Sequence, residues 1–149
     1  MSMKKHIVLL VIILLTLPMK GWGKDLLVIV NKDNPMNLIT KQQIVDLFMG
    51  RSPYFPSGEA VVKLDAPSSS KVREHFYQAL VNMSLPEVNA YWARLMFSGR
   101  ATPPMLVPNE KDIVKLVGSN SNAIGYIPKS SSEELTGDVK TIFVMSVDQ

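Results

Sequence analysis

The feature that most constrains the fold of this chain is an alternation of short apolar segments with amphipathic helical ones. The apolar segments are rich in β-branched residues and short, as is typical of buried strands. They cover residues 26–30, 60–64, 123–127 and 139–144. Strands that alternate with helices along a chain predict an α/β domain, here with a mixed or mainly parallel sheet.

Helix boundaries are marked by capping residues between these segments. Thr40 with Gln43, and Ser84 with Glu87, have the spacing of capping boxes, and Gly118 is expected to end the last helix. The helix after Ser84 is expected to bury one face, made of Val88, Tyr91, Trp92, Leu95 and Met96. Segments rich in proline, glycine and polar residues are expected to be irregular, namely 31–37, 51–59, 100–108 and 129–138.

The first 23 residues have the pattern of a secretory signal peptide. Two lysines precede an apolar run over residues 7–17, and small residues follow it up to Gly23. An uncleaved membrane anchor is the alternative, but this run has 11 residues, against roughly 20 needed to span a bilayer. We therefore expect cleavage after Gly23, one domain over residues 24–149, and a soluble secreted protein.

Charge and composition exclude several classes of function. Lys4, Lys5 and Lys20 leave with the leader, so 13 of the 16 basic residues remain against 13 acidic ones. Such a balance gives no reason to expect binding to nucleic acid. The chain has no cysteine, and His75 is the one histidine after the leader, which excludes a zinc site of cysteine and histidine ligands. No nucleophile elbow accompanies His75, so we expect no enzymatic activity, no metal and no cofactor.

A serine-rich turn before a helix is the strongest functional signal. The first turn of a helix has free backbone N–H groups and a positive dipole end, which together attract anions. Serine hydroxyls and a guanidinium in that place predict a small-oxyanion site, made of Ser68, Ser69, Ser70, Lys71 and Arg73. Substitution of Arg73 by alanine is expected to abolish any phosphate affinity of this site. Helix capping by serine, and pairing of the cations with a nearby glutamate, explain the same residues without a ligand.

Five short motifs occur in a fixed order along the chain, and this order is more informative than any one of them. They are Leu47-Phe48-Met49-Gly50, Leu64-Asp65 with the serine turn behind it, Tyr91-Trp92, Phe97-Ser98-Gly99 and Ala123-Ile124-Gly125-Tyr126. Each motif alone is weak, but the ordered set resembles the periplasmic phosphate-binding proteins of ABC transporters. More narrowly, it resembles short secreted homologues of those proteins.

The resemblance implies an α/β fold that is one lobe of a type II periplasmic-binding-protein fold, with a mixed sheet flanked by helices. It further implies that Ser68, Ser69 and Ser70 match the hydroxyl turn that binds phosphate in that family, and that Arg73 matches its anion-pairing arginine. The glycine of the family's turn is absent here, which hinders close approach of the backbone to a ligand.

The chain has material for one lobe only, whereas a two-lobed receptor needs on the order of 100 residues or more per lobe. Half of the usual ligand shell is therefore expected to be missing, unless a homodimer mate or another protein supplies it. Two hypotheses follow. In the first, the protein binds phosphate or a similar oxyanion for ABC-type uptake or sensing, with a membrane transporter or sensor as partner. In the second, it is an interaction module that docks on a periplasmic sensor or envelope complex without a small ligand.

Overall fold

The protein contains one five-stranded sheet, in the order β3-β2-β4-β1-β5. The computed structural model describes residues 23–147, so the predicted leader lies outside the described residues except for Gly23. The strands are β1 (Leu26–Asn31), β2 (Val62–Asp65), β3 (Met105–Leu106), β4 (Ala123–Pro128) and β5 (Val139–Met145). β2 runs parallel to β3 and β4, whereas β1 is antiparallel to both of its neighbours, β4 and β5. The sheet is therefore mixed, as the sequence predicts.

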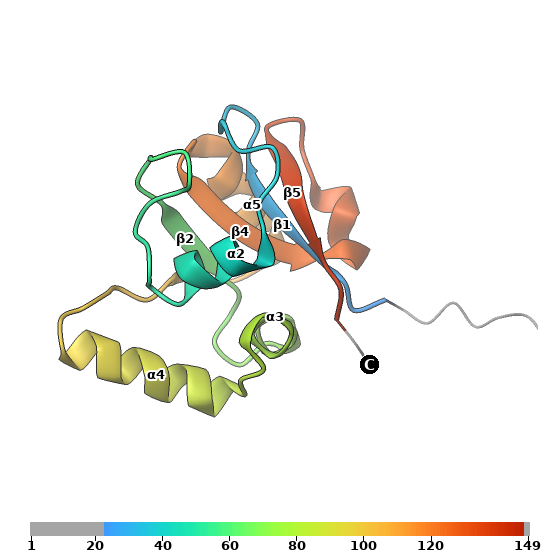
Figure 1. The fold of residues 1–149 in the computed structure, drawn as a ribbon. Helices are drawn as coiled ribbons and strands as arrows, with labels where there is room; N and C mark the ends of the chain where they lie inside the picture. Colours follow the sequence, from blue (N-terminus) through green and yellow to red (C-terminus); the bar gives the residue numbers. More distant parts are fainter. Residues whose placement is uncertain (1–22, 148–149) are drawn as a thin grey trace, which may run out of the picture.

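Helices cover both faces of this sheet (Figure 1). They are α2 (Lys41–Phe48), α3 (Lys71–Val81), α4 (Leu85–Phe97), α5 (Glu110–Ser119) and the 3-10 helix η1 (Lys129–Glu134). α2 and α3 lie on one face, α5 lies on the other, and α4 extends outward beside α3 (Figure 1). The predicted α/β class is confirmed. Within residues 23–147, no helix has both the length and the apolar character that crossing a membrane requires.

The predicted helix starts are confirmed by their hydrogen bonds. The Thr40 hydroxyl accepts from the backbone N–H of Gln43, while the Gln43 side chain accepts from the backbone N–H of Thr40. Ser84 and Glu87 form the same reciprocal pair at the start of α4. Each pair satisfies two of the N–H groups that a helix leaves open at its first turn.

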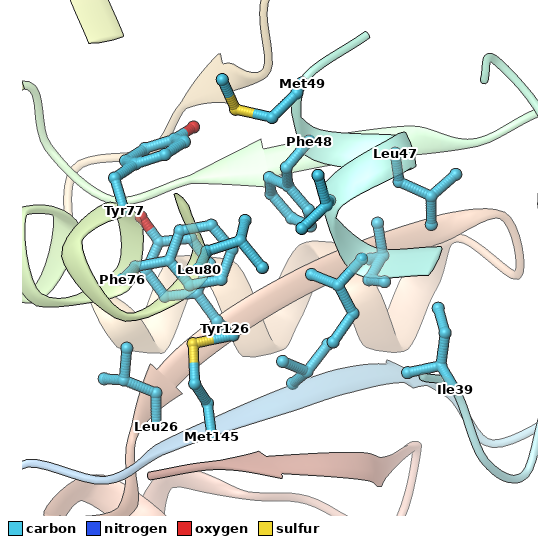
Figure 2. Close-up of a cluster of buried hydrophobic side chains, with 14 of the residues drawn as sticks. Leu26, Ile39, Leu47, Phe48, Met49, Phe76, Tyr77, Leu80, Tyr126 and Met145 are labelled. Carbon is cyan, nitrogen blue, oxygen red and sulfur yellow. The ribbon is translucent and has the colours of Figure 1, made fainter. Parts of the chain in front are cut away.

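Alternation along the strands builds one core on each face of the sheet. On β1, Leu26, Val28 and Val30 face α2 and α3, while Leu27 and Ile29 face α5. Successive side chains of a strand point to opposite faces, so a strand buried on both sides reads as a continuous apolar run. Figure 2 shows the larger core, in which side chains of α2 and α3 meet those of β1, β4 and β5.

Four local predictions are wrong. The segment 129–138, predicted to be irregular, begins with the 3-10 helix η1. The segment predicted as a loop over 100–108 contains the short strand β3, because Met105 and Leu106 pair with the end of β2. α5 continues through Gly118 to Ser119, since packing of α5 on the sheet outweighs the weak helix propensity of one glycine. The buried face of α4 consists of Val88 and Trp92 only, which is narrower than predicted, because α4 extends beyond the sheet.

Gly125 lies where β4 packs against α5. A Cβ atom at this position would lie 2.7 Å from Cγ2 of Ile113. We expect Gly125→Ala to lower the free energy of unfolding by about 1–3 kcal/mol, because the branched Ile113 side chain must shift. Urea unfolding measures the change. Gly137→Ala is the matched control, because a Cβ there meets no atom within 4 Å. An equal effect of the two substitutions would contradict the prediction.

Candidate functional site

The serine turn connects the end of β2 to the start of α3. Ser70 is the N-cap of α3, and its hydroxyl accepts from the backbone N–H of Arg73 at 3.2 Å. Ser68 and Ser69 are exposed, and their hydroxyls have no hydrogen bond to another described residue. The structure thus divides the three serines: Ser70 caps the helix, and the other two are open to solvent beside its N-terminus.

Arg73 is buried beneath this turn. Its Nε donates to Oδ2 of Asp65 at 3.0 Å, and its Nη1 donates to the backbone oxygen of Ser68 at 3.1 Å and to Oδ1 of Asn89 at 3.3 Å. Its Nη2 has no hydrogen bond to a described residue and is not among the fully enclosed polar atoms of residues 23–147. Most of the guanidinium therefore holds the turn in place, and Nη2 is its one nitrogen without a partner among the described residues.

Asp65 is the centre of this network. Besides the Arg73 guanidinium, its carboxylate accepts from the hydroxyls of Tyr77 and Tyr126 and from the backbone N–H of Ala66. The Asp65 and Arg73 side chains are only 1% and 6% exposed. A carboxylate this deeply buried requires such partners, because an unpaired buried charge is costly. The sequence placed Asp65 in the Leu64-Asp65 motif but not at the site; the available signal was an acidic residue ending a strand, eight positions before an arginine.

Lys71 lies apart from this network. It is exposed, and its Nζ forms an ion pair with Oε2 of Glu74 at 3.0 Å, one turn along α3. The glutamate that the sequence offered as an alternative partner is therefore the one the lysine contacts. Lys71 adds positive charge near the helix N-terminus but does not share the buried contacts of Arg73.

The two tyrosines bonded to Asp65 predict how stability depends on alkaline pH. Burial, followed by the nearby Asp65 charge, raises the pKa of Tyr77 and of Tyr126 well above the usual value. The folded state then keeps phenol protons that the unfolded chain releases near pH 10. Stability is full below that pH, and we expect it to fall above it by about 1.4 kcal/mol per pH unit for each of the two groups.

Urea unfolding between pH 9 and pH 12 measures this slope. In Tyr126→Phe, the slope should be about half that of the unmodified protein, because one of the two groups is gone. A slope that does not change in Tyr126→Phe would contradict the assignment.

Comparison with known proteins identifies the fold. No family model matches the sequence, and no curated protein matches it. Among solved structures, an ABC-type phosphate transport receptor from Vibrio cholerae superposes with a TM-score of 0.61 at 20% identity, over 80% of this chain and 45% of that chain. The chain has the fold of one lobe of a phosphate-binding substrate-binding protein. The resemblance predicted from the ordered motifs is thereby confirmed at the level of the fold.

Two further structures of the same kind superpose in the same partial way. A putative phosphate ABC transporter substrate-binding protein from Clostridium perfringens, solved with bound phosphate, has a TM-score of 0.60 at 22% identity, over 80% of this chain and 44% of that one. PstS from Borrelia burgdorferi has a TM-score of 0.57 at 16% identity, over 86% of this chain and 51% of that one. The chain therefore spans about half the length of the structures that it matches.

Proposed function

We propose that this protein binds phosphate or a similar oxyanion at the serine turn, as part of ABC-type phosphate uptake or sensing. The observation that carries the proposal is the pair of exposed hydroxyls on Ser68 and Ser69 beside the N-terminus of α3, together with the Arg73 guanidinium beneath the turn, whose Nη2 has no described partner. Backbone N–H groups of the first turn, two hydroxyls and one guanidinium corner form a donor set suited to an oxyanion. Ser70 and Lys71 complete the proposed site as cap and as nearby charge.

The proposal includes secretion to the periplasm by cleavage of residues 1–23, with residues 24–149 as a single binding domain. Binding and release of the anion require neither catalysis nor a cofactor, so the proposed protein is not an enzyme. One lobe covers an anion from one side, and charge contacts that remain in water contribute only about 0–1 kcal/mol each. Weak binding is therefore expected unless a second copy or a transporter or sensor protein closes the other side.

Calorimetric titration of residues 24–149 with phosphate, with sulfate as the control anion, tests the proposal. The combined substitution Ser68→Ala and Ser69→Ala should weaken phosphate binding by about tenfold, because two donors to the anion are lost. Ser121→Ala is the matched control, since this exposed serine precedes β4 and lies at the opposite end of the sheet. No heat at millimolar phosphate, or an unchanged affinity in the double variant, would overturn the proposal.

Arg73→Ala is a poorer test of the site than the sequence suggests. Its side chain is part of a buried ion pair, so the variant loses stability together with any anion contact. Loss of binding in Arg73→Ala could come from lost stability or from a lost anion contact. Loss of binding after substitution of the exposed serines would come from the lost anion contacts. A decisive experiment on Arg73 therefore needs circular dichroism and an unfolding curve beside each titration.

The second candidate function is an interaction module without a small ligand. It is favoured by the end of α4, where Phe97 is 97% exposed and Met96 is 57% exposed. Large apolar side chains grouped on a surface are typical of contact sites with other proteins. The partner would be a periplasmic sensor or an envelope complex, and crosslinking in intact cells followed by a pull-down tests it. Phe97→Asp should remove the crosslinked partner, and an empty pull-down from the unmodified protein would count against this function.

A further inference from the structure

Lys63 on β2 is a half-buried cation without an acidic partner among residues 23–147. Its Nζ donates to the backbone oxygen of Thr102 at a long 3.4 Å and lies 5.6 Å from the centre of the Trp92 ring. Burial lowers the pKa of Lys63. Asp65, two residues further along the same strand, is paired with Arg73 and bonded to Tyr77, so one charged residue of β2 has a counter-ion and the other has none. Charges removed from water usually have a counter-ion, and Lys63 has none among the described residues.

A cavity of about 470 Å³ lies beside Lys63. Its wall contains a second cation, Arg100, and is otherwise mostly apolar, with contributions from Pro53, Val61 and Met105. None of the residues that line it is an aspartate or a glutamate. A concave, mainly apolar surface with a few convergent polar groups is the usual form of a small-molecule site.

The cavity is separate from the serine turn. It is bordered by Val61, Val62 and Lys63, which lead into and begin β2, whereas the serine turn follows the last residue of that strand. The other borders are the segment around Gly50 and residues 100–103, which precede β3. A ligand here would therefore contact none of the residues proposed to bind phosphate.

We propose that this cavity binds an organic anion, in which a carboxylate or similar group is joined to a short apolar chain. The anionic group pairs with Lys63 and Arg100, which have no acidic partner among the described residues. The apolar chain packs against Pro53, Val61 and Met105. Inorganic phosphate fits the cavity less well, because it is strongly hydrated and has no apolar part to cover this wall.

Backbone amide NMR of the protein titrated with hexanoate tests the proposal, with 1-hexanol as the neutral probe of similar size. Hexanoate should cause saturable shifts at Gly50, Ala101 and Met105. Lys63→Met keeps an unbranched apolar side chain at this position but removes the charge, and it should weaken hexanoate binding by about tenfold. Binding of 1-hexanol should be weaker from the start and unchanged by that substitution.

Two controls keep the test decisive. Ser69→Ala should leave hexanoate binding unchanged, so that this proposal and the phosphate proposal can fail separately. Arg100→Gln, an exposed position, replaces Lys63→Met if the latter does not fold, and it should also weaken hexanoate binding. The proposal is overturned if hexanoate causes no saturable shift at 20 mM, or shifts other residues only. It is equally overturned if hexanoate binds a folded Lys63→Met as tightly as the unmodified protein.

Discussion

Replacement of Arg73 by alanine should lower the free energy of unfolding by about 3–5 kcal/mol. The substitution leaves the Asp65 carboxylate buried without its cation, and it removes the bonds that hold Ser68 and Asn89 in place. A loss of this size is a large part of the total stability of an ordinary domain, which is about 5–15 kcal/mol. Urea unfolding followed by circular dichroism measures it.

A second variant separates the buried charge from lost packing. Asp65→Asn combined with Arg73→Met removes both charges and retains an aliphatic side chain at position 73. The new amide oxygen can accept from the Tyr126 hydroxyl, and the amide NH2 can donate to the Tyr77 hydroxyl oxygen. We expect this double variant to be clearly more stable than Arg73→Ala, because no unpaired charge remains. Lys71→Ala, in the same turn of α3, should leave the urea midpoint unchanged, since its ion pair is exposed. If Arg73→Ala unfolds at the same urea concentration as Lys71→Ala, the proposed importance of the buried pair is wrong.

Replacement of Phe76 by alanine should cost about 3–5 kcal/mol. The Phe76 ring is fully buried and stacks on Tyr126, with ring centroids 3.7 Å apart and ring planes 3° apart. It also forms T-shaped pairs with Phe48 of α2 and with Tyr77, with ring centroids 4.9 Å and 5.1 Å apart (Figure 2). The substitution therefore opens a cavity at the point where α2, α3 and β4 meet, and the rigid neighbouring rings cannot fill it.

Phe97→Ala is the matched control for Phe76→Ala, because it removes the same atoms from an exposed position. It should change the free energy of unfolding by less than about 0.5 kcal/mol. Thermal and urea unfolding of the two variants, measured side by side, test the pair of predictions. A small effect of Phe76→Ala, or equal effects of both variants, would show that the aromatic cluster does not support the fold in this way.

Elements with local signals were predictable from the sequence. The capping boxes at Thr40 and Ser84 use residues three positions apart, so their hydrogen bonds depend on neighbouring residues alone. The four longer strands were recognisable because apolar runs flanked by polar segments have few alternatives. β3 was missed, because a two-residue strand exists only through its pairing with β2.

The serine turn was predicted at its place in the chain, whereas the contacts of its basic residues were not. The turn, its serines and the basic residues after it are adjacent in sequence, and the resemblance to phosphate-binding proteins correctly pointed to the fold. The sequence could not show that the Arg73 side chain turns inward to Asp65 while Lys71 stays in solvent. Both are basic residues in one helical turn, and only the packing of α3 on the sheet distinguishes them.

By itself, the sequence determined the class of fold, the order of most elements and the position of the serine turn. These features depend on hydrophobic period, capping and turn residues, which act over a few positions. Tertiary structure alone decided which charges are paired. Arg73 is paired with Asp65, whereas Lys63 has no acidic partner among the described residues. The physical reason is that the cost of a charge depends on its burial and its partners, and both are set by segments far apart in the chain.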